Sequence, residues 1–185
     1  MMKCSVHIAT SLDGYIAKKD NSLDWLHHAG KPEIEIDAGW QSYIKTVDCM
    51  IMGRSTMQVI SEMNLTPEQW PYGELRIIVL SNTLKEAPKN MQGKVEMYSG
   101  DLKALVKKLE QEGYQHSYID GGVTVQNFIN LKLLNEITIS YAPVLLGDGI
   151  PLFANLNKEV KLENAKATAF ANDFTQLSYD IVYSD

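Results

Sequence analysis

The chain of 185 residues is long enough to bury a substantial core, and we expect residues 1–185 to form one domain. Its net charge of −6 argues against a nucleic-acid surface, and no apolar run approaches the roughly 20 residues that cross a membrane. The N-terminal stretch lacks the pattern of a signal peptide, so we expect a cytoplasmic protein without a membrane partner.

Residues 3–10 are predicted as a strand, because apolar residues alternate with the others along this stretch. The loop from residue 11 to about residue 30 is long for a plain connection, which favours a functional loop. It contains Trp25, whose ring either covers an edge of the core or forms one wall of a ligand pocket. His7 has no histidine at metal-ligand spacing, so we predict no metal site.

Residues 32–47 are predicted as a helix, because the apolar residues from Ile36 onward recur three and four apart. Pro32 suits the first helical position. Asp37 lies beside the apolar stripe, where a desolvated carboxylate could serve in proton transfer. The plain alternative is an acidic residue in a first helical turn, where the helix dipole favours negative charge.

The chain is organised around residues 49–56. An apolar strand over residues 49–52 ends at Gly53, and apolar residues three apart predict a helix starting near Arg54. The first amides of a helix have no internal partner, and a forked arginine suits a phosphate. This stretch is either an anion site or an ordinary strand-to-helix turn with a solvated arginine.

Strands and helices continue to alternate up to residue 141. Further strands are predicted at residues 75–80, 95–98, 117–119 and 137–141, helices at 102–112 and after 122, and a final pair of strands at 166–171 and 174–183. Gly121 and Gly122 lie between a strand and a helix, which suggests a backbone close to a group such as a pyrophosphate. The pattern predicts an α/β sheet with an antiparallel edge.

Taken together, these motifs resemble the dihydrofolate reductase superfamily, and within it the branch related to the reductase domain of bacterial riboflavin biosynthesis. In chain order they are Ala9–Ala17, Leu23–Leu26, Met52–Thr56, Trp70–Tyr72, Val79–Ser81, Gly121–Gly122 and Pro143–Phe153. The resemblance implies a three-layer α/β/α fold, with a mostly parallel eight-stranded twisted sheet and an antiparallel C-terminal edge.

The same resemblance implies NADPH as the cofactor. Two helix starts would hold its phosphates, and Arg54 would favour the extra 2′-phosphate of NADPH over NADH. Backbone groups of Ala9 and Ile16 would meet the nicotinamide carboxamide. The full set of implied cofactor residues is Ala9, Ile16, Gly53, Arg54, Ser55, Thr56, Leu80, Ser81, Asn82, Gly121, Gly122, Val123 and Thr124.

On the substrate side, the resemblance implies hydride transfer to a small planar heterocycle. Trp25 and Trp40 would contact this substrate, and Asp37 falls where the folate enzymes keep the acid that supports protonation. Asp120 stands where those enzymes have a glycine, and an acidic residue there is more like the riboflavin branch.

Three activities follow from the resemblance. The most similar one is 5-amino-6-(5-phosphoribosylamino)uracil reductase. The alternatives are a true dihydrofolate reductase and a non-catalytic nucleotide-binding protein on the same fold. Relatives on the riboflavin branch usually pair, so we expect a homodimer.

Overall fold

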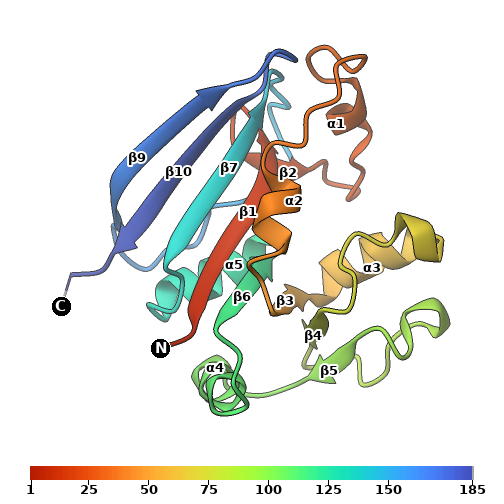
Figure 1. The fold of residues 1–185 in the computed structure, drawn as a ribbon, viewed down its shortest axis with the longest axis vertical. Coiled ribbons are helices and arrows are strands. Elements are labelled where there is room, and N and C mark those ends of the chain that lie inside the picture. The colour runs from red at the N-terminus through yellow and green to blue at the C-terminus, as the bar shows by residue number, and fades with distance from the viewer. Residues whose placement is uncertain (185) are drawn as a thin grey trace.

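An eight-stranded sheet forms the centre of the molecule, with helices on both of its faces (Figure 1). The computed structural model describes residues 1–184. The strand order is β5-β4-β3-β6-β1-β7-β10-β9. The strands from β5 to β7 in this order run parallel, whereas β10 is antiparallel to both β7 and β9. The predicted fold, a mostly parallel sheet with an antiparallel C-terminal edge, is confirmed.

Strands and helices alternate along most of the chain. The strands of the sheet are β1 (Lys3–Ser11), β3 (Cys49–Gly53), β4 (Arg76–Leu80), β5 (Glu96–Tyr98), β6 (His116–Asp120), β7 (Glu136–Ala142), β9 (Lys161–Ala169) and β10 (Thr175–Val182). The helices are α1 (Asp24–His28), α2 (Trp40–Ile44), α3 (Arg54–Glu62), α4 (Leu102–Gln111) and α5 (Gly122–Asn130), with short 3-10 turns η1 (Pro67–Gln69) and η2 (Lys89–Met91). Among the helices of residues 1–184, none has the length and apolar character needed to cross a membrane.

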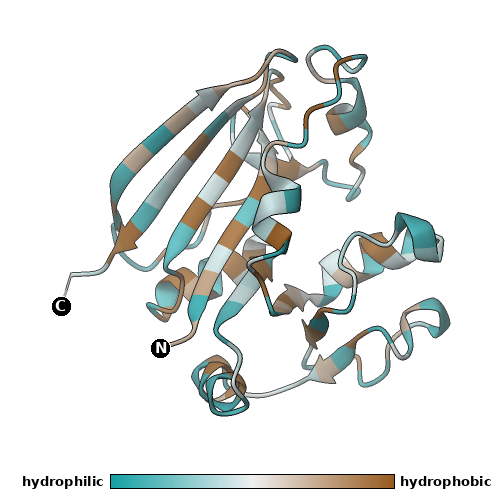
Figure 2. Ribbon diagram, viewed as in Figure 1, coloured by the Kyte–Doolittle hydropathy of each residue, from teal (hydrophilic) through white to brown (hydrophobic). Residues whose placement is uncertain are grey.

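Two apolar clusters fill the two faces of the sheet. On one face, Leu109 of α4 and Phe128 of α5 are fully buried against the sheet. On the other face, Met57 of α3 packs with Met50 and Met52 of β3, and α2 adds partly buried aromatic rings. The alternation of apolar and polar residues along β1 and β7 is visible in Figure 2. Burial of such alternating and helical stripes is the main force that holds the layers together.

The C-terminal hairpin departs from expectation at its first strand. β10 matches the predicted strand over residues 174–183, but β9 begins at Lys161 rather than at residue 166. Every residue of β9 is exposed, because the strand lies at the edge of the sheet (Figure 1). A strand with solvent on both faces needs no apolar alternation, so its first half carries no pattern that predicts it.

The predicted helix over residues 32–47 is wrong in its first half. Residues 32–39 form turns and irregular structure, and only α2 is helical. Ala38 has a φ of +50° and Gly39 a φ of +79°, and this left-handed backbone cannot continue a right-handed helix. Asp37 therefore lies outside the helix, and its side chain is exposed rather than placed along a buried stripe.

A two-stranded ribbon, which sequence reasoning assigned to loops, pairs β2 (Tyr15–Ala17) with β8 (Ile150–Pro151). The carboxylate of Asp13 stabilises the turn before β2. It accepts hydrogen bonds from the Ser11 hydroxyl at 2.6 Å and from the amides of Leu146 and Gly147 at 3.1 and 2.7 Å. These bonds tie the motif around Asp13 to the glycine-rich segment before β8.

Candidate functional site

The carboxyl ends of four neighbouring strands, β4, β3, β6 and β1, form one continuous edge. Gly53 is paired with Leu80, and Met52 with Asp120, so the segments that follow β3, β4 and β6 lie side by side. Spacings of about 4.8 Å between strands make this edge roughly 14 Å wide, comparable to an extended dinucleotide. The structure thus gathers the sequence-predicted stretches Gly53–Thr56, Leu80–Asn82 and Gly121–Thr124 along one line.

Two helices of nine residues begin at this edge, α3 at Arg54 and α5 at Gly122. In the described part of the chain, neither helix start has a hydrogen bond from a side-chain cap. Backbone amides at such starts are ready donors to the oxygen atoms of a ligand, and both helix dipoles favour negative charge there. Paired in this way, the two helix starts suit a diphosphate.

Glycines hold these two helix starts against each other. A Cβ atom on Gly53 would lie 2.9 Å from Oγ1 of Thr124, and one on Gly121 would lie 2.6 Å from Oγ1 of Thr56. Gly121 also has a φ of +95°, which a residue with a side chain rarely adopts. Helix packing therefore requires these glycines, in addition to any ligand that approaches them.

Arg54 reaches from the start of α3 to the loop that follows β4. Its Nη1 donates to Oγ1 of Thr83 at 2.9 Å, and its side chain is exposed. The Ser81 hydroxyl accepts from the amides of Thr83 and Leu84, which closes a tight turn at the end of β4. Arg54 therefore lies near Ser81 and Asn82. This arrangement is the one expected if these residues bind the adenosine and the 2′-phosphate of NADPH.

The ribbon places Ile16 beside the start of α5. A Cβ atom on Gly122 would lie 2.6 Å from the carbonyl oxygen of Pro151 and 3.4 Å from Cδ1 of Ile16. Ala9, near the end of β1, is the other residue predicted to meet the carboxamide, and it lines a cleft on the α2 side of the sheet. The two predicted carboxamide residues therefore lie on either side of the junction between β1 and the ribbon.

A cleft of about 310 Å³ opens between β1, β7, the segment before α2 and the turn between β9 and β10. Its walls are apolar or neutral, and they come from segments far apart in the chain. They consist of His7, Ile8, Ala9, Leu26, Ile36, Ala38, Trp40, Ser140, Asn172 and Phe174. A cleft of this size can hold a small flat ring system.

The predicted substrate residues fall at different places around this cleft. Trp40 lines it, as expected. Trp25 is buried in a separate cluster with Ala29 and Ala142, and its neighbour Leu26 is the α1 side chain that reaches the cleft. Asp37 lies between two lining residues, but both oxygens of its carboxylate accept from the Gln41 amide at 3.2 Å. The catalytic role of Asp37 stays a prediction.

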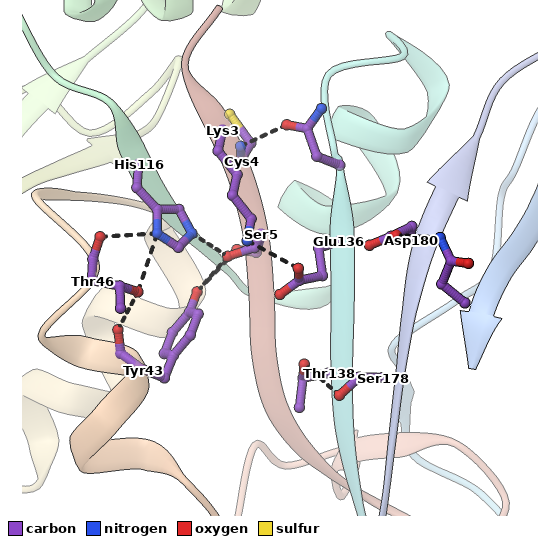
Figure 3. A network of polar contacts seen from close by, with 12 residues as sticks. Lys3, Cys4, Ser5, Tyr43, Thr46, His116, Glu136, Thr138, Ser178 and Asp180 are labelled. Atoms are coloured by element: carbon purple, nitrogen blue, oxygen red, sulfur yellow. Dashed lines mark hydrogen bonds and ion pairs between the residues drawn. The ribbon is translucent and has the colours of Figure 1, made fainter. Parts of the chain in front are cut away.

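A buried polar network anchors α2 beside the cleft (Figure 3). The Tyr43 hydroxyl lies 2.9 Å from Oγ of Ser5, which lies 2.7 Å from Nε2 of His116. Nδ1 of His116 lies 3.0 Å from the carbonyl oxygen of Thr46, so Nδ1 carries the proton and Nε2 accepts from Ser5. Burial lowers the pKa of His116, which keeps the ring neutral and the network intact at pH 7.

Asp120 is an acidic residue at this edge, and it was not among the predicted site residues. Burial raises the pKa of its carboxyl to about 6, although hydrogen bonds from the Gly121 amide and the Tyr118 hydroxyl oppose the shift. Tyr118 in turn packs edge to face with Trp40 at 5.6 Å, which links Asp120 to the wall of the cleft. Its position directly before Gly121 and Gly122, at the end of a strand, is the sequence signal for this residue.

Comparisons with known proteins agree with this geometry. The family model described as the RibD C-terminal domain matches residues 3–176. The uncharacterised protein YwjB of Bacillus subtilis (strain 168) is 36% identical over 179 residues, which cover 96% of this chain and 97% of YwjB. A crystal structure from Shewanella sp. PV-4, of a protein provisionally assigned to riboflavin biosynthesis, has a TM-score of 0.89 at 38% identity and covers 98% of this chain and 100% of that one.

The fold also extends to the folate enzymes. Dihydrofolate reductase from Enterococcus faecalis, solved in complex with NADP(H) and RAB-propyl, has a TM-score of 0.62 at 11% identity, with 97% of this chain and 96% of that chain covered. At this identity the similarity concerns the fold alone. The dihydrofolate reductase-like fold and the riboflavin-reductase branch of the resemblance are thereby confirmed.

Proposed function

Because this chain belongs to the RibD C-terminal domain family, we propose that it is an NADPH-dependent reductase of a small planar heterocycle, such as a pteridine or an aminopyrimidine. The observation that carries this proposal is the pair of uncapped helix starts that meet at one sheet edge beside the cleft. When bound, NADPH supplies the hydride, and the protein contributes binding, orientation and the exclusion of water.

The residues of the edge would divide this work. The amides at the starts of α3 and α5 would bind the diphosphate, and Arg54 beside Thr83 would bind the 2′-phosphate. Backbone groups of Ala9 and Ile16 would orient the nicotinamide carboxamide. The cleft next to Ala9 would then hold the substrate ring against the reactive face of the cofactor.

Arg54→Ala tests the cofactor assignment. We expect wild type to bind NADPH more tightly than NADH, and the variant to lose most of that preference, because a charge-assisted contact to the 2′-phosphate is worth roughly 1.5–3 kcal/mol. Affinity for NADH should change little. Tryptophan fluorescence titrations with both nucleotides measure this, and Lys103→Ala, which removes an exposed cation from α4, is the control. Equal affinity of wild type for the two nucleotides would contradict the assignment.

Asp37→Asn tests the predicted proton donor. Asparagine keeps an oxygen for the Gln41 amide, so the start of α2 should survive while the carboxyl group that would act in proton transfer is lost. We expect kcat for dihydrofolate or a dihydropterin to fall about 100-fold, with NADPH affinity unchanged. The matched control is Glu159→Gln, which neutralises an exposed carboxylate outside the lining of the cleft. Unchanged turnover would assign the proton to Asp120 or to water.

The expected homodimer remains part of this proposal. Its support is that relatives on the riboflavin branch usually form dimers. Light scattering at micromolar concentration measures the oligomeric state directly. A measured mass equal to that of one chain would contradict the predicted homodimer and leave the reductase proposal in place.

A further inference from the structure

We propose that the cleft selects a flat heterocycle that carries no phosphate group. This inference rests on the proposed reductase function and concerns the substrate class of the same site. It separates this chain from an enzyme whose substrate is a phosphoribosyl compound. Three features of the cleft support it: its wall, the charges on its rim, and the helix start beside it.

The wall of the cleft is electrically neutral. The residues that line it in the described chain are apolar, aromatic, hydroxyl or amide groups, and His7 is the one that titrates. Burial lowers the pKa of His7, against the opposing effects of the Ala38 backbone, Asp37 and Glu136, so its ring is neutral at pH 7. His7 is also held within an aromatic array, with its ring centroid 4.8 Å from that of Tyr43. A neutral, aromatic wall suits stacking on a flat ring.

The charges on the rim are acidic. Asp37 lies between the lining residues Ile36 and Ala38, and Asp173 lies between Asn172 and Phe174. Both carboxylates are exposed. Lys31, the cation of this rim, is paired with Asp173, with 3.1 Å between Nζ and Oδ1. Because Lys31 offsets the charge of Asp173, the net charge of this rim comes from Asp37, and a phosphate dianion entering here would meet like charge whereas a neutral ring would not.

The helix start beside the cleft already holds an anion. Phosphates bind at forked arginines or at free amides of helix starts. α1 and α2 both contribute to this cleft: α1 carries the acidic Asp24 in its first turn, and in α2 the amide of Gln41 in the first turn is taken by the carboxylate of Asp37. The starts of the two nine-residue helices α3 and α5 lie on the carboxyl edge of the sheet, where the cofactor phosphates are proposed to bind. The cleft therefore repels a phosphate group and provides no arranged hydrogen-bond donors that would bind one.

The remaining polar groups of the cleft are arranged for an uncharged ligand. Nε2 of Gln176 donates to the carbonyl oxygen of Ala38 at 2.8 Å and to Oγ of Ser140 at 2.9 Å. This bridge fixes the segment before α2 to β7, and it leaves the Ser140 hydroxyl proton to be donated elsewhere. A hydroxyl donor in a neutral wall recognises a ring carbonyl or ring nitrogen.

Matched pairs of ligands test this inference. The first pair is dihydroneopterin and its monophosphate, and the second is 5-amino-6-(5-phosphoribosylamino)uracil and the same compound without its phosphate. Kd is measured by calorimetry on protein saturated with NADP+, the oxidised cofactor, so that no hydride is transferred during the titration. We expect the unphosphorylated member of at least one pair to bind at least tenfold more tightly than its phosphorylated partner.

A designed cation sharpens the test. Ile36 is partly buried, lies in an irregular segment and lines the cleft, so a longer side chain there can reach the ligand without disturbing a helix or strand. Ile36→Lys should raise affinity for the phosphorylated members at least tenfold and leave NADPH affinity unchanged. Ile36→Gln is the matched neutral control and should keep the wild-type preference.

The outcomes separate the two proposals. If NADPH binds and the phosphorylated members bind more tightly to wild type, or if no member of either pair binds, this inference is overturned and the cofactor assignment stands. If NADPH itself fails to bind, the proposed function fails, and the inference that rests on it falls too.

Discussion

Gly121→Ala should destabilise the protein by about 2–6 kcal/mol and weaken NADPH binding more than 100-fold. With a φ of +95° and a ψ of 139°, Gly121 adopts a conformation that costs a residue with a side chain roughly 1–3 kcal/mol. The new Cβ atom would also lie 2.6 Å from Oγ1 of Thr56, and overpacking of this kind costs about 1–3 kcal/mol more. Relief of that contact requires the Thr56 side chain to change rotamer or the starts of α3 and α5 to move apart.

The control for this experiment separates the effect of the steric clash between the new Cβ atom and Thr56 from the effect of backbone strain. Gly113 has a φ of +99°, and a Cβ atom built there meets nothing within 4 Å. Gly113→Ala should therefore cost only about 1–2 kcal/mol and leave NADPH binding intact. Urea unfolding and NADPH titration of both variants measure the two effects. Equal losses in the two variants would mean that the junction of the helix starts has no special role.

Asp120→Asn should make the protein more stable at pH 8, by up to about 3 kcal/mol. The folded-state pKa of about 6 lies above the ordinary value of 3.8, so the folded protein binds this proton more tightly than the unfolded chain does. Below about pH 4 both states are protonated and the group costs nothing. As pH rises from about 4 to 6, the unfolded chain has lost this proton while the folded protein still holds it, so the free energy of unfolding falls; above about pH 6 the partly buried charge keeps it lower by a constant amount.

The asparagine variant removes this charge and keeps an oxygen for the Gly121 amide. Its advantage over wild type should therefore be full at pH 8, shrink between about pH 6 and pH 4, and vanish below about pH 4. Asp13→Asn is the control of opposite sign, because hydrogen bonds from Ser11 and from the amides of Gly147 and Leu146 lower the pKa of Asp13. That variant should be less stable than wild type at pH 8. An Asp120→Asn variant less stable than wild type at pH 8 would show that the charged form is favoured.

A carboxyl group that is kept at a cost in stability points to a use. Asp120 lies at the carboxyl edge, its pKa is near neutrality, and aromatic contacts connect its neighbour Tyr118 to Trp40 of the cleft. We therefore propose Asp120 as the alternative to Asp37 as the source of the proton.

The parts of the site that follow local rules could be predicted from sequence. Gly53–Arg54 and Gly121–Gly122 mark strand-to-helix turns, and parallel pairing of β3 with β6 brings such turns together once the sheet is assigned. The cleft has no such signal. It is assembled from β1, the segment before α2, β7 and the turn around Asn172, which are adjacent only in the folded chain.

The errors have equally specific causes. Pro32, as a residue typical of a first helical position, extends the prediction back from the apolar stripe that begins at Ile36, but the left-handed backbone of Ala38 and Gly39 ends any helix there. Ala38 is bridged to the sheet by Gln176, a contact across more than a hundred residues that no local pattern indicates. Trp25 is apolar enough for either of its predicted roles, and the burial of its ring against Ala142 could be decided only by the fold.

The most direct measurement of the central claim is a crystal structure of the protein grown with NADPH. We expect the diphosphate between the starts of α3 and α5, the 2′-phosphate beside Arg54, and the nicotinamide ring next to Ala9 at the mouth of the cleft. NADPH bound away from this edge, or no NADPH in crystals grown at saturating concentration, would contradict the assignment of this family member as an NADPH-dependent reductase.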